Sequence, residues 1–301
     1  MTDEERYEAL NDEVLALYRE QRYAEALALI EARGAQLPGW RSDLAHTTAC
    51  LHAAAGDAPA ALGDLVRASR EGAWWHPRLL LEDDDLAGLH ELAGFEDLVA
   101  ESARRCEAAQ SDATRRPPVV VRPTGPARAV LAVLHGAGQS AAKAVPVWSS
   151  AVEQGLAVVG VESSWLSTPT YRTWPDQPAA ARDVATALES LHPDERALPV
   201  VAAGFSAGAR AALLWALQGD PQPVAAVLAV APAVTAEQVR EPAHRPPGVV
   251  VIGAEDDLLA DAREALHDLP DVRLEVVAGL GHAYPEDFPT RLGAALRVLV
   301  P

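Results

Sequence analysis

A single serine stands in a setting that favours nucleophilic chemistry. Residues 204–208 read Gly-Phe-Ser-Ala-Gly, a G-x-S-x-G pattern centred on Ser206. The apolar run Pro199–Ala203 precedes it and the helix-forming run Ala209–Leu217 follows it, which is the strand–turn–helix setting that such a nucleophile needs. The turn would hold the hydroxyl at a helix N-terminus, where the helix dipole favours developing negative charge. A plain Gly-Ser turn is the alternative interpretation.

A serine hydroxyl becomes a useful nucleophile only when a base removes its proton. Among the nine histidines, His282 is the candidate base. It follows the last strand-like run, Arg273–Val277, through a short loop. Such a loop can return the imidazole to the edge of the sheet where Ser206 is expected.

The predicted base also needs a carboxylate that fixes its tautomer. The loop Gly253–Asp257 leaves the carboxyl end of another apolar run, at a point between Ser206 and His282 in the sequence. Asp256 and Asp257 are the two candidates that this loop offers.

Acyl transfer requires backbone donors that stabilise a tetrahedral oxyanion. The N–H of Ala207 is one, by its position directly after the nucleophile. The second should come from the loop after the early apolar run Ala129–Leu134, where small residues leave the backbone open to a ligand. We predict the Ala137 N–H, with Gly138 in reserve.

The elements that position these residues alternate between strand and helix. Near-continuous apolar runs separated by helical stretches predict an α/β fold with a mostly parallel sheet that helices cover on both faces. Such sheets place ligand sites at the carboxyl ends of their strands. The predicted strands are Val119–Val121, Ala129–Leu134, Ala157–Val161, Pro199–Ala203, Ala225–Ala229, Gly248–Ile252 and Arg273–Val277. The predicted helices include Gln177–Leu191, Ala207–Leu217 and Asp261–Asp268.

Residues 1–113 are helical in character and are predicted to form a separate all-α domain. An offset of 34 residues superposes Leu10 on Leu44 and Leu17 on Leu51, which is the tetratricopeptide period. A plain bundle of helical hairpins is the alternative. Two repeats are too few to bury a full core by themselves, because each repeat buries its apolar face only against its neighbours. We therefore expect this domain to pack on the catalytic domain or on a second subunit, or to bind a protein partner. The polar, proline-bearing stretch 114–118 is the predicted linker to a catalytic domain at residues 117–301.

Residues from about 119 to 301 resemble the α/β-hydrolase family. The resemblance rests on His-Gly at 135–136, Gly-Phe-Ser-x-Gly at 204–208, Gly-x-x-Asp at 253–256 and Gly-x-Gly-His at 279–282. The set is most similar to the carboxylesterase, thioesterase and dienelactone-hydrolase branches. The resemblance implies the chain order nucleophile, acid, histidine, selects Asp256 over Asp257 by its spacing, and gives His135 a structural role. Dienelactone hydrolases often carry a Cys nucleophile, whereas this chain has Ser206.

The family resemblance implies a serine hydrolase that cleaves small carboxylic esters or thioesters through a Ser-His-Asp triad, an acyl-enzyme and no cofactor. A peptidase of the prolyl-oligopeptidase type, another acyl transferase and a catalytically inert interaction protein are the alternatives. Trp165, Tyr171 and Trp174 belong to a short insertion, residues 163–177. We expect them to line an acyl or aryl pocket, with simple loop packing as the alternative.

Composition argues against several other classes of function. The chain has 43 acidic and 25 basic residues, a formal net charge of −18, which repels phosphate backbones and anionic lipid. We therefore expect neither nucleic acid nor a membrane as partner. The sequence has no phosphate-loop or dinucleotide glycine pattern and no clustered Cys/His spacing, so no metal is predicted. We interpret the run Asp83–Asp85 as a helix cap.

The two cysteines, Cys50 and Cys106, are too few for a disulfide framework and are predicted to be free packing residues. The acidic N-terminus does not resemble a signal peptide. No apolar run reaches the ~20 residues that a membrane-spanning helix needs, so we expect a cytoplasmic protein.

Overall fold

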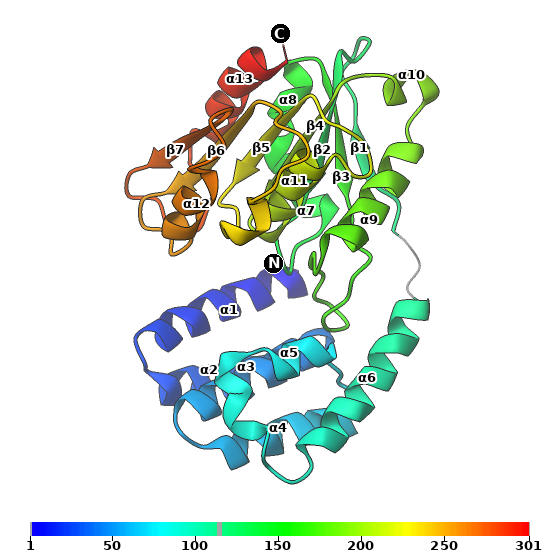
Figure 1. Cartoon of the computed structure of the whole chain (residues 1–301). Helices are drawn as coiled ribbons and strands as arrows, with labels where there is room; N and C mark the ends of the chain where they lie inside the picture. Colours follow the sequence, from blue (N-terminus) through cyan, green and yellow to red (C-terminus); the bar gives the residue numbers. More distant parts are fainter. Residues whose placement is uncertain (1, 113–115, 301) are drawn as a thin grey trace. The chain divides into compact units, whose positions relative to one another are not determined.

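The computed structural model describes residues 2–112 and 116–300 (Figure 1). These residues form two compact units. The helical unit comprises residues 2–112 together with Leu166–Tyr171, and the sheet unit comprises residues 116–165 and 172–300. The predicted linker and domain boundary fall partly on residues 113–115, which lie outside the described residues.

The helical unit consists of antiparallel helices that bury small and aliphatic residues between them. Thr2 opens the first helix with a capping box, in which its hydroxyl accepts from Glu5 N and the Glu5 carboxylate accepts from Thr2 N. Ala26 and Leu51 are fully buried, so neighbouring helices can approach closely. The α-helices are α1 (Asp3–Arg19), α2 (Tyr23–Gly34), α3 (Arg41–Ala54), α4 (Ala58–Arg70), α5 (Pro77–Leu81) and α6 (Phe95–Asp112), and the 3₁₀ helices are η1 (Pro38–Trp40) and η2 (Asp84–Leu89).

The sheet unit is built on seven strands in the order β1-β3-β2-β4-β5-β6-β7. The edge strand β1 is antiparallel to β3, and every other neighbouring pair is parallel. The strands are β1 (Val119–Val121), β2 (Ala129–Leu134), β3 (Leu156–Val161), β4 (Val200–Phe205), β5 (Ala226–Val230), β6 (Gly248–Gly253) and β7 (Val272–Val277). A nearly all-parallel sheet needs cover on both faces, and its central strands are apolar on both faces accordingly.

Helices cover each face of the sheet and give the unit two hydrophobic cores, one on each side (Figure 1). Alternate residues of β2 face opposite cores, with Ala132 in the first and Leu131 in the second. The first core packs α9 (Gln177–Glu189), α11 (Ala207–Gln218) and α12 (Leu259–Leu266) against the sheet. The second packs α7 (Ala141–Trp148), α8 (Ser150–Glu153) and α13 (Phe288–Leu299). Two short helices, α10 (Pro193–Arg196) and the 3₁₀ helix η3 (Glu237–Val239), complete the unit.

The predicted fold class is confirmed, and all seven predicted strands are present within a few residues of their expected ends. Strand β4 runs two residues further than predicted, to Phe205, and so reaches the residue before Ser206. Helix α12 begins at Leu259, two residues before the predicted start. Helices α7, α8 and α13 were not among the predicted ones, partly because Pro146 lies inside α7 and interrupts its helical pattern.

Residues 166–171 belong to the helical unit although they follow β3 in the sequence. The Leu166 carbonyl accepts from Gln110 Nε2 at 3.0 Å, and the Ser167 carbonyl accepts from the His76 N–H at 2.7 Å. Leu166 also packs with Trp74 and Cys106. The chain therefore leaves the sheet unit after β3, contributes six residues to the helical unit and returns.

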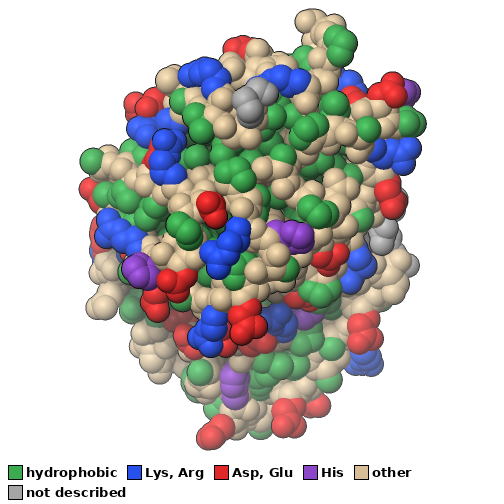
Figure 2. Space-filling view, turned by 45° about the horizontal axis from the view of Figure 1, so that its top comes forward, with side chains coloured by type: hydrophobic (Ala, Val, Ile, Leu, Met, Phe, Trp, Pro, Cys, Tyr) green, Lys and Arg blue, Asp and Glu red, His purple; other side chains and the backbone are tan. Residues whose placement is uncertain are grey.

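One face of the molecule mixes charges of both signs. Asp and Glu side chains lie among Lys and Arg side chains on the face drawn in Figure 2, rather than in one block. Cys50 and Cys106 are both buried and free, as predicted. Within residues 2–112 and 116–300, no helix combines the length and apolarity needed to cross a lipid bilayer.

Candidate active site

Ser206 sits on a sharp turn between β4 and α11. Its backbone has φ 53° and ψ −119°, a conformation that is strained for a residue with a side chain. The turn is held by close packing, because a Cβ on Gly208 would lie 2.3 Å from the backbone oxygens of Leu134 and His135. Only glycine therefore fits at position 208, and the hydroxyl of Ser206 stands at the N-terminus of α11.

The structure brings Ser206, His282 and Asp256 together. His282 Nε2 lies 3.0 Å from Ser206 Oγ, and His282 Nδ1 lies 2.9 Å from Asp256 Oδ2. Because a carboxylate only accepts hydrogen bonds, the neutral imidazole carries its proton on Nδ1 and leaves Nε2 free to accept from the serine hydroxyl. The three residues follow β4, β6 and β7, at the carboxyl ends of these parallel strands.

Asp256, and not Asp257, contacts His282. The Asp256 side chain is 1% exposed, and its second oxygen accepts from the Leu258 N–H at 3.0 Å. Asp257 is exposed to solvent. The loop after β6, which carries Asp256, meets the loop after β7, which carries His282, at Gly253. A Cβ on Gly253 would lie 2.0 Å from the Leu280 carbonyl oxygen. This close approach sets the position of the loop that carries His282.

The loop after β2 presents the backbone where the second oxyanion donor was predicted. The reserve candidate, the Gly138 N–H, already donates to the Arg172 carbonyl at 2.8 Å. This bond leaves Ala137 as the better candidate beside Ala207, the first residue of α11. Arg172 is itself buried, and its guanidinium donates to the Ser163 carbonyl at 2.7 Å. No sequence motif pointed to Arg172, because its role depends on contacts that leave no local pattern in the sequence.

His135 is a buried structural residue, in agreement with the role that the resemblance implied. Its Nδ1 lies 2.7 Å from the Gly136 carbonyl, and its Nε2 accepts from the Ser163 N–H at 3.2 Å. These partners require a neutral ring with the proton on Nδ1. Burial lowers the pKa of His135, which keeps the ring in that neutral form.

An aromatic cluster supports the histidine. The Phe205 ring lies 5.1 Å from the His282 ring and stacks on Tyr284 at 4.6 Å. The Tyr284 hydroxyl accepts from Trp148 Nε1 at 3.1 Å, and burial raises the pKa of Tyr284 well above its ordinary value. Phe288 packs against both Tyr284 and Trp148. These residues restrict the orientation of His282, and apart from their apolar character nothing in the sequence distinguished them.

The three aromatics predicted to line a pocket have different surroundings. Trp174 is 1% exposed, lies in the hydrophobic core and donates from Nε1 to the His135 carbonyl at 2.7 Å, so it acts by packing behind the oxyanion loop. Tyr171 belongs to the helical unit, where burial raises its pKa. Trp165 belongs to the sheet unit and is half-buried. For Trp174, loop packing was the better interpretation.

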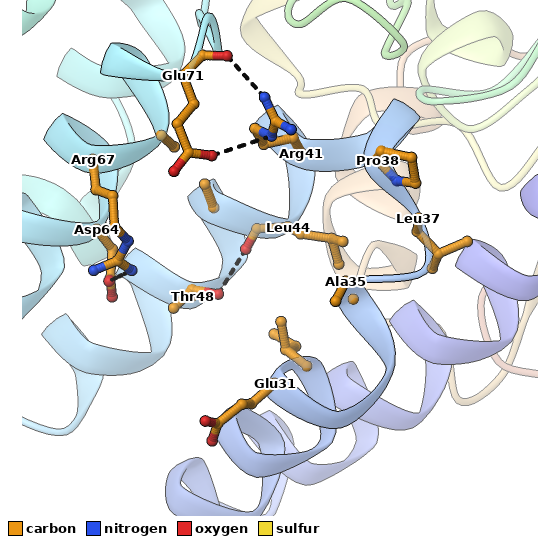
Figure 3. Close-up of a pocket in the computed structure, with 14 residues that line it drawn as sticks. Glu31, Ala35, Leu37, Pro38, Arg41, Leu44, Thr48, Asp64, Arg67 and Glu71 are labelled. Atoms are coloured by element: carbon orange, nitrogen blue, oxygen red, sulfur yellow. Dashed lines mark hydrogen bonds and ion pairs between the residues drawn. The ribbon is translucent and has the colours of Figure 1, made fainter.

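The helical unit has a surface cavity of about 450 Å³ among α2, α3 and α4 (Figure 3). Arg41 on its wall donates to the Glu71 carbonyl at 2.8 Å, and its Nε lies 3.5 Å from the Glu71 carboxylate. Arg67 pairs with Asp64 on the same wall. Charged groups that pair with one another thus lie on the wall of the cavity. Binding of a protein partner by the helical unit stays a prediction.

Comparison with known proteins gives matches to both units. Residues 6–110 match the family described as A/B hydrolase-like, N-terminal domain, and residues 125–247 match the family described as serine aminopeptidase, S33. A search of curated protein sequences gives no match.

The solved structures that are similar to this chain include the following two. An uncharacterized protein from Bacillus cereus ATCC 10987 is 25% identical over 98% of each chain, with a TM-score of 0.52. Esterase PE8 is 20% identical over 62% of this chain and 100% of its own, with a TM-score of 0.51. The first likeness extends over both units, and the second covers a length close to that of the sheet unit. With the sheet order and the two family matches, these likenesses show that the chain has the α/β-hydrolase fold, with an N-terminal helical unit.

Proposed function

We propose that the chain is a serine hydrolase that cleaves small carboxylic esters or thioesters through an acyl-enzyme on Ser206. One observation carries the proposal. His282 lies within hydrogen-bonding distance of both Ser206 and Asp256, at 3.0 and 2.9 Å, in the chain order nucleophile, acid, histidine. This arrangement of a nucleophile, a base and a carboxylate activates a serine hydroxyl for attack.

In the proposed first step, Ser206 Oγ attacks the substrate carbonyl carbon while His282 Nε2 takes the hydroxyl proton. The Asp256 carboxylate stabilises the resulting imidazolium and holds its tautomer. The backbone N–H groups of Ala207 and Ala137 stabilise the oxyanion, helped by the positive end of the α11 dipole. Collapse of the intermediate breaks the bond to the alcohol or thiol, which leaves with the proton from His282.

In the proposed second step, water attacks the acyl-enzyme. His282 Nε2 removes a proton from the water and returns it to Ser206 Oγ when the carboxylic acid leaves. His282 is 39% exposed, so water reaches the base without a large rearrangement. No step requires a metal or an organic cofactor.

The substrate class follows from the accessibility of the site. The segment 163–177 is too short to form a large helical lid, and Ser206 is half-buried rather than enclosed. We therefore expect small, uncharged substrates, with graded rather than absolute preference among acyl chains, because apolar pockets discriminate by roughly 1–3 kcal/mol per methylene.

Labelling with a fluorophosphonate, followed by assays on a panel of nitrophenyl esters, tests this proposal. The full chain should be labelled on Ser206 and should hydrolyse short-chain or aryl esters. Ser206→Ala should lose both labelling and turnover, on the order of 10³-fold or more, and adding His282→Ala should cost little further because the residues act as a unit. Additive losses, or labelling elsewhere, would contradict the assignment.

A peptidase is the second candidate, because residues 125–247 match a family described as serine aminopeptidase. It predicts turnover of aminoacyl nitroanilides at rates at least equal to those of the matching esters. Rapid ester turnover with negligible anilide cleavage supports the esterase proposal. Failure to react with fluorophosphonates would instead favour a catalytically inert interaction protein.

A further inference from the structure

Three side chains of different chemistry converge in the helical unit, and none of them is among the residues proposed for catalysis. His46 and Cys50 are four residues apart on α3, so they project from the same face of that helix. Asp83 comes from the segment before η2. His46 Nε2 lies 3.3 Å from Asp83 Oδ2, and Cys50 Sγ lies 3.8 Å from the same oxygen and 4.0 Å from His46 Nε2.

The spacing of these atoms suits ligands around one ion. Zinc holds nitrogen and oxygen ligands at about 2.0–2.2 Å and sulfur at about 2.3 Å in a tetrahedral arrangement. These lengths place neighbouring nitrogen and oxygen ligands about 3.3 Å apart, and sulfur about 3.6 Å from either. The observed nitrogen–oxygen separation has that value, and the two sulfur separations are a few tenths of an ångström longer. An ion pair in direct contact would be shorter, at about 2.7–2.9 Å.

The carboxylate is held in place by its own neighbours. Asp83 Oδ1 accepts from the Asp85 N–H at 3.0 Å, as expected of a helix cap, which leaves Oδ2 toward His46 and Cys50. The Tyr18 hydroxyl in turn donates to the Asp85 carboxylate at 2.8 Å. Supporting hydrogen bonds of this kind orient metal ligands and raise affinity.

The site is closed on one side and reachable on the other. Cys50 is 8% exposed and packs in a hydrophobic cluster with Leu65 and Leu86. The side chains of His46 and Asp83 are 15% and 25% exposed, so an ion can enter and keep a water molecule as its fourth ligand. Thiolate and imidazole exclude a preference for magnesium or calcium, which favour oxygen ligands, and select a zinc-class cation.

We propose that His46, Cys50 and Asp83 bind one zinc-class divalent cation, which links α3 to the start of η2 in the helical unit. Coordination replaces the Cys50 thiol proton, which passes to solvent, with a sulfur–metal bond. The ion joins segments 33 residues apart, and it stabilises the folded helical unit by mass action. The sequence predicted no metal because the cysteine and the carboxylate are too far apart along the chain to form a recognisable motif.

Titration of Zn²⁺ and Co²⁺ into the untagged, reduced, chelator-treated full chain tests this proposal. We expect one bound ion per chain, a thiolate-to-cobalt charge-transfer band, and a higher melting temperature with Zn²⁺. Cys50→Ala and His46→Gln should each lower the affinity by at least about tenfold and abolish the thermal shift. Cys106→Ala removes the other buried cysteine of the same unit and should change neither.

Asp83→Asn provides a variant that keeps the helix cap, because asparagine caps helices as well as aspartate does. It should fold with unchanged circular dichroism and bind Zn²⁺ more weakly. The proposal fails if the wild-type chain binds no Zn²⁺, if folded Asp83→Asn and Cys50→Ala bind it as well as the wild type, or if Cys106→Ala loses it. Ester hydrolysis is assayed in parallel, and its outcome does not bear on this site.

Discussion

Thr168 Oγ1 donates a hydrogen bond to Asp43 Oδ1 at 2.8 Å, which joins the segment after β3 to helix α3 of the helical unit. The Thr170 hydroxyl donates to the other oxygen of the same carboxylate. Asp43 is 7% exposed, and a buried carboxylate is costly unless its oxygens are hydrogen-bonded. The two threonines thus bind residues 166–171 to the helical unit by polar contacts, in addition to the packing of Leu166.

Thr168→Val should lower the free energy of unfolding by about 1–3 kcal/mol, because it leaves a buried carboxylate oxygen without its donor. Urea denaturation of the full chain measures the change. Thr235→Val is the matched control, since Thr235 is exposed and its substitution should change stability by no more than about 0.5 kcal/mol. Equal stabilities of the two variants would contradict the structural role of Thr168.

Removal of the helical unit should destabilise the sheet unit. A chain of residues 117–301 retains Leu166, Ser167 and Thr168, which are buried within the helical unit in the full chain. Their exposure should promote aggregation, detected by size-exclusion chromatography and by binding of a hydrophobic dye. A monomeric, fully active truncation with the melting temperature of the intact chain would mean that this segment refolds without the helical unit.

The Asp43 carboxylate should make stability depend on pH. Burial raises its pKa above the ordinary value, against the opposite effect of the hydrogen bonds from Thr170 and Thr168. A raised pKa in the folded state means that stability is fully present below the unfolded pKa and is lost as pH rises through the folded one. Relative to Asp43→Asn, the wild type should therefore lose stability as the pH rises above about 4, the ordinary pKa of an aspartate. Urea denaturation of both chains at several pH values measures this change, and a wild type that gains stability relative to Asp43→Asn as the pH rises would refute it.

The carboxylate that serves His282 can be identified by amide substitution. Asp256→Asn should slow ester hydrolysis by several orders of magnitude, because it removes the acceptor that fixes the imidazole tautomer; a comparable change in a serine protease costs ~10⁴ in kcat. Asp257→Asn alters an exposed neighbour and should retain near wild-type kcat. The reverse ranking would transfer the role by one residue without changing the mechanism.

The positions of the strands along the chain could be predicted because buried parallel strands leave a strong local signal. Runs such as Gly248–Gly253 are apolar on both faces, and this pattern indicates a buried strand. The candidate nucleophile could be predicted for a similar reason, since β4, Ser206 and α11 follow one another directly in the sequence. His282 and Asp256 needed the family order in addition, because the contact between them spans 26 residues.

Features that depend on contacts between distant segments could not be predicted. The bond from Thr168 to Asp43 spans 125 residues, and nothing in the sequence of residues 166–171 suggests that they join the helical unit. Arg172 acts through its backbone carbonyl, which every residue possesses. Trp174 was assigned to a pocket because the sequence does not distinguish an aromatic residue that lines a pocket from one that packs in the core. Its hydrogen bond to the His135 carbonyl is visible only in the fold.

Gly253 and Gly281 provide a matched pair that tests whether the geometry of the His282 loop controls catalysis. A Cβ on Gly253 would lie 2.0 Å from the Leu280 carbonyl oxygen and 2.4 Å from that of Gly281, whereas a Cβ on Gly281 meets no atom within 4 Å. Gly253→Ala should therefore displace the loop that carries His282, while Gly281→Ala leaves its position unchanged. A displacement of about 1 Å costs on the order of 10²-fold in rate, so we expect a loss of that size in kcat for the first variant and little for the second. Circular dichroism checks that both variants fold. Equal kcat values in two folded variants would show that the loop adjusts freely and that its contact with Gly253 does not set the position of the base.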